Sequence, residues 1–181
     1  MTTSDLGVLY VVACGGQPAL GLEPFVCQAL AAGWDVCVIA TPSGTRFVDV
    51  ARLAELTGHP VRSEYKRPGE PDVLPPADAF VVAPATFNTV NKLAAGISDT
   101  LALGLLCEAI GAGKPILLAP SAGGPLAHHP ALAASLATLR GWGIHVLPDP
   151  TAEGLPFPWD QLSSELSRLA AQRRAGARPS R

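Results

Sequence analysis

The sequence predicts a single domain with a doubly wound, Rossmann-like (flavodoxin-like) α/β fold, in which helices cover both faces of a mostly parallel sheet. Apolar runs of strand length alternate along the chain with segments of helical periodicity, and this alternation is typical of parallel sheets. The strand-like runs are apolar at nearly every position, as in strands that are buried on both faces. At 181 residues the chain is long enough to enclose one substantial core.

The expected strands are short apolar runs, each bounded by glycine, proline or polar residues. The first, "LGVLYVVA", is almost continuously apolar, and "DVCVIAT", "AFVVA", "PILLA" and "IHVLP" repeat the pattern. A weaker run, "PVRSEY", predicts a short additional strand. The resulting strands lie at 6–13, 35–41, 60–65, 79–83, 115–119 and 144–148.

The segments between these runs have helical patterns. Gly33 and Gly58 are suited to end the first two helices, because glycine is favoured just past a helix C-terminus. The segment 66–78 contains four prolines and must be a loop. The resulting helices lie at 18–34, 46–58, 89–113, 129–143 and 159–172.

Composition excludes several classes of function. The net charge is −2, so no basic field favours nucleic acid, and no apolar run reaches the ~20 residues of a membrane span. The N-terminus has no basic region ahead of its first strand, so we expect no signal peptide and a cytoplasmic location. Charged residues are only 15% of the chain, which fits either a surface partly covered by other subunits or an alanine-rich composition.

The four cysteines are Cys14, Cys27, Cys37 and Cys107, and none has CxxC spacing. A zinc site or disulfide framework is therefore not expected. We interpret them as small buried side chains in a reducing compartment, with Cys14 beside a candidate site.

In this fold class a ligand binds beyond the carboxyl ends of the strands, where the strand order reverses. That point lies between the first strand and the strand at 79–83, so three loops should meet there: 14–19, 41–47 and 83–89. The residues expected to line the pocket are Gly15, Gly16, Gln17, Thr41, Ser43, Thr45, Thr86, Asn88 and Thr89.

Glycines ahead of a helix N-terminus favour a phosphate, since free N–H groups and the helix dipole point at it. "CGGQPALG" is not GxGxxG, and no carboxylate ends the second strand to bind a ribose, which disfavours NAD. No nucleoside triphosphate loop is present either. A mononucleotide with a flat polar ring fits better. The alternatives are that Gly15-Gly16 forms only a turn and that Thr86 or Asn88 only caps a helix.

The stretch "APATFNTVNKLAAGISDTL" resembles the Pro-Ala-Ser-Ala-Asn-Thr segment of the homo-oligomeric flavin-containing cysteine decarboxylases, where Asn-Thr runs on into Lys-Ile-Ala-x-Gly-Ile-x-Asp. "VCVIATPSGTRFVDVARLAELTGHPV" and "PALAASLATLRGWGIHVL" are also similar to segments of that family, so the resemblance covers most of 6–148. The family includes phosphopantothenoylcysteine decarboxylase and peptidyl-cysteine decarboxylases.

The resemblance implies FMN as cofactor, no metal, a small-molecule or peptide substrate, and a homo-oligomer, either a trimer or a dodecamer of trimers. It implies an FMN-binding domain at 1–158, followed by a C-terminal helix and basic tail at 159–181. The cofactor-binding residues it implies are Gly15, Gly16, Gln17, Thr41, Ser43, Phe47, Ala85, Thr86, Phe87, Asn88, Thr89 and Ala122.

The chain departs from the family at the catalytic and substrate-binding positions. The family's essential histidine precedes an Ala-Asp pair, but here Glu70 stands near that place. The family's Pro-x-Met-Asn-x-x-Met-Trp element binds the substrate carboxylate through its Asn, and the aligned stretch at 120–130 has lost it. The diagnostic positions are now Ala122, Gly123, Leu126 and Ala127, and the flap at 149–162 has no cysteine.

Three hypotheses follow. The first is an FMN-binding flavoprotein that performs a flavin redox step, including oxidative decarboxylation, on an unidentified substrate. The second is a non-catalytic FMN-binding or regulatory subunit, and the third is a phosphopantothenoylcysteine decarboxylase with unrecognised substitutes. The catalytic residues are unassigned. Asn88, Glu70 and His128 are the candidates, although His128 and His129 also fit a surface pair that flanks a helix.

Overall fold

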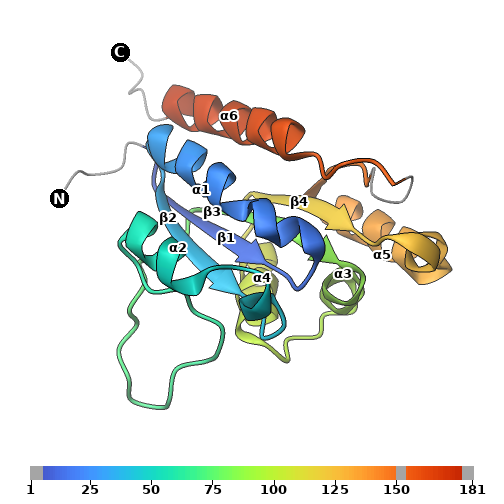
Figure 1. Cartoon of the computed structure of the whole chain (residues 1–181), viewed down its shortest axis with the longest axis horizontal. Coiled ribbons are helices and arrows are strands. Elements are labelled where there is room, and N and C mark those ends of the chain that lie inside the picture. The colour runs from blue at the N-terminus through green and yellow to red at the C-terminus, as the bar shows by residue number, and fades with distance from the viewer. Residues whose placement is uncertain (1–5, 150–153, 177–181) are drawn as a thin grey trace.

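The computed structural model describes residues 6–149 and 154–176, which form a five-stranded parallel sheet between two layers of helices (Figure 1). The strand order is β2-β1-β3-β4-β5, so the order reverses between β1 and β3. This arrangement confirms the predicted doubly wound α/β fold. The strands are β1 Val8–Ala13, β2 Asp35–Ala40, β3 Ala79–Thr86, β4 Ile116–Ser121 and β5 His145–Val146.

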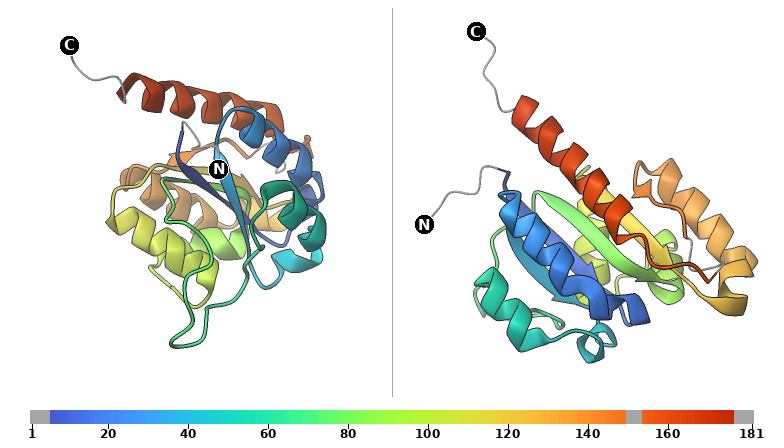
Figure 2. Two further views of the ribbon diagram at one scale, coloured as in Figure 1. Left: turned by 90° about the vertical axis from the view of Figure 1, so that its left-hand side faces the viewer. Right: turned by 45° about the horizontal axis from the view of Figure 1, so that its top comes forward.

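Successive residues of each central strand point into different cores. In β1, Leu9 and Val11 pack with one cluster, whereas Tyr10 and Val12 pack with the other. The first cluster lies under α1, α2 and α6, and the second under α3, α4 and α5, so helices cover both faces (Figure 2). The helices are α1 Leu22–Ala31, α2 Val50–Thr57, α3 Phe87–Ala94, α4 Leu101–Gly111, α5 Pro130–Gly141 and α6 Trp159–Gly176.

The helix predicted over 89–113 is wrong as a single element, because the chain breaks it between α3 and α4. Gly96 has φ +69°, a left-handed conformation that ends α3. Thr100 then caps α4, and its Oγ1 accepts a hydrogen bond from the Leu103 N–H at 3.3 Å. This break turns Thr100 toward the same side of the sheet as the start of α3.

The predicted loop at 83–89 is also wrong, because β3 continues to Thr86 and α3 begins at Phe87. Ala85 and Thr86 pair with β4 after a register shift. The strand predicted at 60–65 contributes only one bridge, between Ile39 and Arg62.

Other boundaries differ by a turn or less. The first predicted helix opens with a 3-10 segment, η1 Gln17–Gly21, ahead of α1. A second 3-10 segment, η2 Gly44–Arg46, precedes α2, which begins where the Asp49 side chain accepts from the Arg52 N–H. Gly33 and Gly58 have left-handed backbones just past α1 and α2, as predicted.

The C-terminal helix α6 packs on the same core as α1. Its residues Leu162, Leu166 and Ala170 are buried, and Trp159 lies against the Phe25 ring at 5.7 Å. The predicted helix over 159–172 is confirmed and extends to Gly176. The part of the predicted basic tail beyond it lies outside the described residues.

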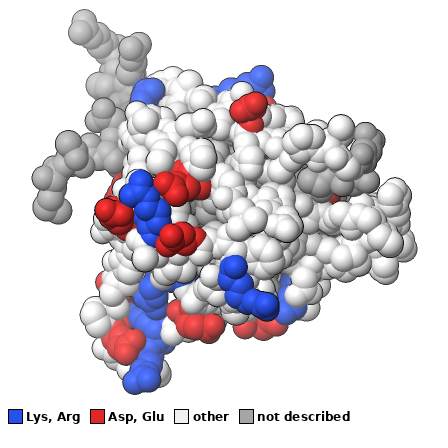
Figure 3. Space-filling view, viewed as in Figure 1, with Lys and Arg blue, Asp and Glu red and all other residues white. Residues whose placement is uncertain are grey.

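Charged side chains are unevenly distributed over the surface. In Figure 3 they gather over α2 and over the loop that precedes β3, whereas the side that carries α5 shows few. At α2, Arg52 pairs with Glu23 at 3.1 Å and with Glu55 at 2.9 Å. Among the helices that the structure describes, none is both long and apolar enough to cross a bilayer.

Gly44 provides a test of how closely the chain after β2 approaches β1. A Cβ at Gly44 would overlap the Ala13 carbonyl oxygen, whereas a Cβ at Gly111 would meet nothing within 4 Å. We expect Gly44→Ala to lower the free energy of unfolding by about 1–3 kcal/mol, measured by urea denaturation. The control Gly111→Ala should leave it unchanged or slightly raised. Equal unfolding midpoints for the two variants would show that η2 is not packed against β1.

Candidate functional site

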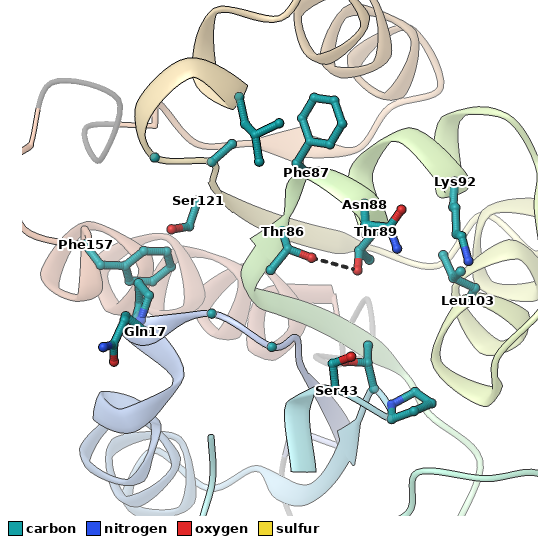
Figure 4. Close-up of a pocket in the computed structure, with 18 of the residues that line it drawn as sticks. Gln17, Ser43, Thr86, Phe87, Asn88, Thr89, Lys92, Leu103, Ser121 and Phe157 are labelled. Atoms are coloured by element: carbon teal, nitrogen blue, oxygen red, sulfur yellow. Dashed lines mark hydrogen bonds between the residues drawn. The ribbon is translucent and has the colours of Figure 1, made fainter. Parts of the chain in front are cut away.

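A cavity of about 830 Å³ lies at the carboxyl ends of β1, β2, β3 and β4 (Figure 4). Its volume is in the range of small-molecule sites, and its place is the switch point of the sheet. Four connecting segments supply most of its lining: 15–18 after β1, 41–43 after β2, 86–89 at the start of α3, and 121–126 after β4. Lys92, Thr100, Leu103, Leu155 and Phe157 complete it.

The segments after β1 and β2 are in close contact because of glycine. A Cβ at Gly15 would lie 2.8 Å from the Ser43 Cβ, which is closer than real side chains come. Gly16 caps η1 without a side chain, and Pro18 follows in its first turn. The backbone at Gly15 and Gly16 therefore borders the cavity directly.

The hydroxyls after β2 have different roles. Thr41 Oγ1 accepts a hydrogen bond from the Gly44 N–H at 3.0 Å and so holds the turn into η2. Thr45 Oγ1 donates to the Pro42 carbonyl at 2.8 Å and does not line the cavity, contrary to prediction. Ser43 lies at the cavity, and its hydroxyl caps no helix.

The start of α3 presents the densest group of polar atoms. Thr86 Oγ1 lies 3.2 Å from Thr89 Oγ1, and the exposed Asn88 lies beside Thr89, on the side away from Thr86 (Figure 4). Thr86 occupies the N-cap position, but its side chain makes no capping hydrogen bond. The N–H groups of the first turn have no partners within the helix, so they add donors and the positive end of the helix dipole to the cavity.

Cys14 is fully buried beneath this group. Burial raises the pKa of its thiol, and hydrogen bonds with Thr89 and Thr86 offset only part of the rise. Cys14 therefore remains a neutral thiol, as expected of a buried side chain. Cys37 is buried and Cys107 half-buried, but Cys27 is exposed, so the prediction of buried cysteines is wrong for Cys27.

The segment after β4 is fixed by an acidic residue that follows β5. The Ala122 N–H donates to Asp149 Oδ2 at 3.0 Å, which holds this segment against the end of the sheet. Leu126 lies further along, in the 3-10 segment η3 Gly124–His128. Ala122 itself is buried and lines the cavity, as the resemblance implied.

Of the twelve residues predicted to bind the cofactor, the structure brings ten to this cavity. Ala85 is fully buried in β3, opposite Pro120 of β4, and does not reach the lining. Phe47 is half-buried at the end of η2, where its N–H donates to the Gly44 carbonyl, and it also lies outside the lining.

Only one of the three catalytic candidates is at the cavity. Asn88 lines it, whereas Glu70 lies in the exposed loop before β3, where its carboxylate accepts from the Arg67 N–H at 2.9 Å. His128 is exposed, with Nδ1 3.4 Å from the Gly124 carbonyl. His129 caps α5, because its Nδ1 accepts from the Ala131 N–H at 3.1 Å. The alternative interpretation of the two histidines as a pair that flanks a helix is therefore the correct one.

Some residues that line the cavity were not predicted from the sequence. Ser121 directly follows a predicted strand, so its position at the carboxyl edge was a usable signal. Lys92 and Thr100 were hidden inside the helix predicted as continuous over 89–113. Leu155 and Phe157 belong to the segment before α6, and nothing in its sequence pattern links it to the other four segments.

The cavity lining is more apolar than polar and is almost uncharged. Lys92 is the single charged side chain among the described residues that line it, and its Nζ lies 2.5 Å from Asp99. The described lining contains no carboxylate, imidazole or thiol, and the described residues hold no metal-binding group of His, Cys, Asp or Glu. Such a lining suits binding by hydrogen bonds and apolar contacts better than acid–base chemistry by side chains.

A second cavity, of about 520 Å³, lies between α4 and the loop before β3. Its lining includes the rings of Tyr10 and Phe80, whose centroids are 5.4 Å apart. Burial raises the pKa of Tyr10 to about 12, and its hydroxyl donates to the Pro75 carbonyl at 2.9 Å. None of its described lining residues comes from the segments at the carboxyl edge of the sheet.

Comparison with known proteins agrees with the fold. A model of the Flavoprotein family matches residues 8–169. The Coenzyme A biosynthesis bifunctional protein CoaBC of Mycolicibacterium smegmatis is 33% identical over 148 residues, which are 77% of this chain and 34% of that protein. The chain thus spans about a third of the length of the curated relatives it matches.

Two solved structures share the fold. HAL3 from Cryptococcus neoformans has a TM-score of 0.74 and 22% identity, over 94% of this chain and 99% of that one. The FMN-dependent cysteine decarboxylase TvaF from thioviridamide biosynthesis has a TM-score of 0.72 and 24% identity, over 92% and 98%. At these identities the likeness shows the fold alone.

Proposed function

The chain belongs to the Flavoprotein family, and on this premise we propose that it binds FMN at the carboxyl edge of its sheet. We further propose that it performs a flavin-dependent redox step of the decarboxylase type on an unidentified substrate. The observation that carries the proposal is the convergence of ten predicted residues on one cavity at the switch point. A neighbour of the same fold is described as an FMN-dependent cysteine decarboxylase.

The residues present fit FMN. Gly15 and Gly16 allow close backbone approach, and the Ser43 hydroxyl adds a donor, so this side would hold the phosphate and ribitol. The Asn88 amide and the first-turn N–H groups of α3 would border the ring edge, which needs both donors and acceptors. Bound FMN would supply a two-electron acceptor.

The chain's own residues would bind and orient the cofactor rather than transfer protons. Thr86 and Thr89 hold each other's hydroxyls in place at 3.2 Å, so the α3 end of the site is preorganised. Phe87 would stand beside the ring, and its position is fixed by an edge contact with His129 at 5.4 Å.

A non-catalytic FMN-binding or regulatory subunit is the second candidate function. It is favoured by the lack of any acid or base among the described lining residues and by the exposure of Glu70 and His128. A phosphopantothenoylcysteine decarboxylase is disfavoured as well, because Gly123 and Leu126 provide no side-chain amide to bind a substrate carboxylate. A homo-oligomer, as a trimer or dodecamer, is part of the first proposal, and the sparsely charged side in Figure 3 is consistent with it.

The cofactor is tested by the visible absorption of the purified protein and by titration of the flavin-free protein with FMN. We expect an oxidised flavin spectrum and saturable binding. Asn88→Asp should weaken FMN binding about tenfold or more, because an ionised carboxylate cannot donate a hydrogen bond to the ring edge. Gln161→Glu, the same chemical change on exposed α6, should bind as the wild type does. A protein that takes up no FMN would contradict the proposed function.

The reaction class is tested by anaerobic incubation of the FMN-loaded protein with cysteine-terminated peptides and with phosphopantothenoylcysteine. Because the described lining has no histidine and no side-chain amide in the segment after β4, the flavin should stay oxidised and no carbon dioxide should be released. Bleaching of the flavin together with carbon dioxide release would show that these substrates are accepted despite the substitutions.

A further inference from the structure

One side of the cavity differs in chemistry from the rest. Phe87, Ala122, Leu126, Leu155 and Phe157 contribute only apolar side chains to it, and together they are called the apolar wall below. They come from the start of α3, the segment after β4 and the segment before α6. Most of the polar residues lie on the segments after β1 and β2 and on the remainder of the first turn of α3, and Ser121 at the end of β4 stands between Phe87 and Phe157 in the view of Figure 4.

The apolar wall is held in place at both ends by aromatic contacts. Phe87 meets His129 edge-on, with ring centroids 5.4 Å apart and planes at 81°. Phe157 packs edge-on against Trp159 at 4.7 Å, and Trp159 packs on Phe25 of the core. Such contacts fix side-chain positions before a ligand arrives, which lowers the entropic cost of binding.

The apolar wall is not simply part of the core. Leu126 is 49% exposed and Leu155 is 53% exposed, so each leaves about half of its surface to be covered by a ligand. Covering apolar surface contributes roughly 25 cal/mol for each Å².

The charged side chains near the apolar wall disfavour the binding of an anion there. The Asp149 carboxylate lies directly behind Ala122, whose N–H it accepts at 3.0 Å. Lys92, the one cation of the described lining, pairs with Asp99 and stands beside Leu103, on the far side of the close-up from Phe157 (Figure 4). His129 uses its Nδ1 lone pair to cap α5 and turns its ring toward Phe87. A carboxylate placed against the apolar wall would lose hydration and would meet no cation among the described residues of that wall.

We infer that the substrate group that meets the apolar wall is apolar and uncharged, an aromatic or branched aliphatic group rather than an amino-acid carboxylate. This inference rests on the proposed FMN site, because the apolar wall would border the bound cofactor at Phe87 and Ala122 and would meet the substrate at Leu126, Leu155 and Phe157. It gives the substrate a chemical class: a molecule with a neutral hydrophobic end.

The experiment uses FMN-loaded protein and three probes: benzamide, benzoate and acetamide. Benzamide and benzoate share a ring and differ in charge, whereas acetamide lacks the ring. By calorimetric titration we expect benzamide to bind about tenfold or more tightly than benzoate, since a desolvated carboxylate without a partner is disfavoured. Acetamide should bind more weakly than benzamide because it covers none of the apolar wall.

A charge placed in the apolar wall makes the test specific for its location. Leu126→Lys should reverse the order, so that benzoate binds more tightly than benzamide at an unchanged FMN content. The control Val73→Lys changes a residue of similar exposure, 50%, in the loop before β3, and should keep the wild-type order. FMN content of each variant is measured from its visible absorption.

Two kinds of failure are distinguishable. A protein that binds no FMN overturns the proposed function and this inference with it. A protein that binds FMN but prefers benzoate, binds no probe, or keeps its order of preference in Leu126→Lys overturns the inference alone.

Discussion

The parallel pairing of β1 with both β2 and β3 is the constraint on which the candidate site depends. Val12 of β1 is in register with Ile39 on one side and Val82 on the other, so all three strands end at the same edge. A shift of one residue would move each side chain of β1 into the opposite core, where the neighbouring side chains are packed around a residue of different shape. Because this register is imposed by apolar side chains on both faces, the site inherits its geometry from the core.

The close approach of the chain after β2 to β1 extends that constraint into the cavity. Gly44 lies against the Ala13 carbonyl, and Thr41 Oγ1 holds its N–H. Gly15 in turn allows contact with Ser43. Two glycines and one hydroxyl thus convert a strand edge into a concave surface lined by backbone, which is the kind of surface that a phosphate requires. The low charge of the lining fits this arrangement, because backbone N–H groups would bind a phosphate in place of cationic side chains.

Much of this arrangement could be predicted from the sequence, because it depends on local patterns. Continuous apolar runs identified the strands, and the switch point placed Gly15, Ser43 and Thr86 together without knowledge of distances. The break between α3 and α4 had a local signal, since Gly96 and Thr100 are residue types that end and cap helices, but the apolar residues on both sides favour one continuous helix. The sequence alone also does not predict which loop residues reach the cavity, because that depends on how each loop packs on the rest of the fold.

Glu70 and Phe157 illustrate this second limit. Glu70 has a suitable chemistry and a suitable place in the sequence, but the loop before β3 leaves it in solvent. Phe157 has no motif, but the packing of Trp159 on α1 brings it to the cavity. In both cases long-range packing determines the outcome, and a single sequence carries no direct signal of such contacts.

A crystal structure of the protein with FMN bound would test the central claim most directly. The account predicts flavin density at the ends of β1 to β4, with the phosphate near Gly15, Gly16 and Ser43 and the ring edge within hydrogen-bond distance of Asn88. Density in the second cavity, beside Tyr10 and Phe80, or a ring turned away from α3, would contradict it.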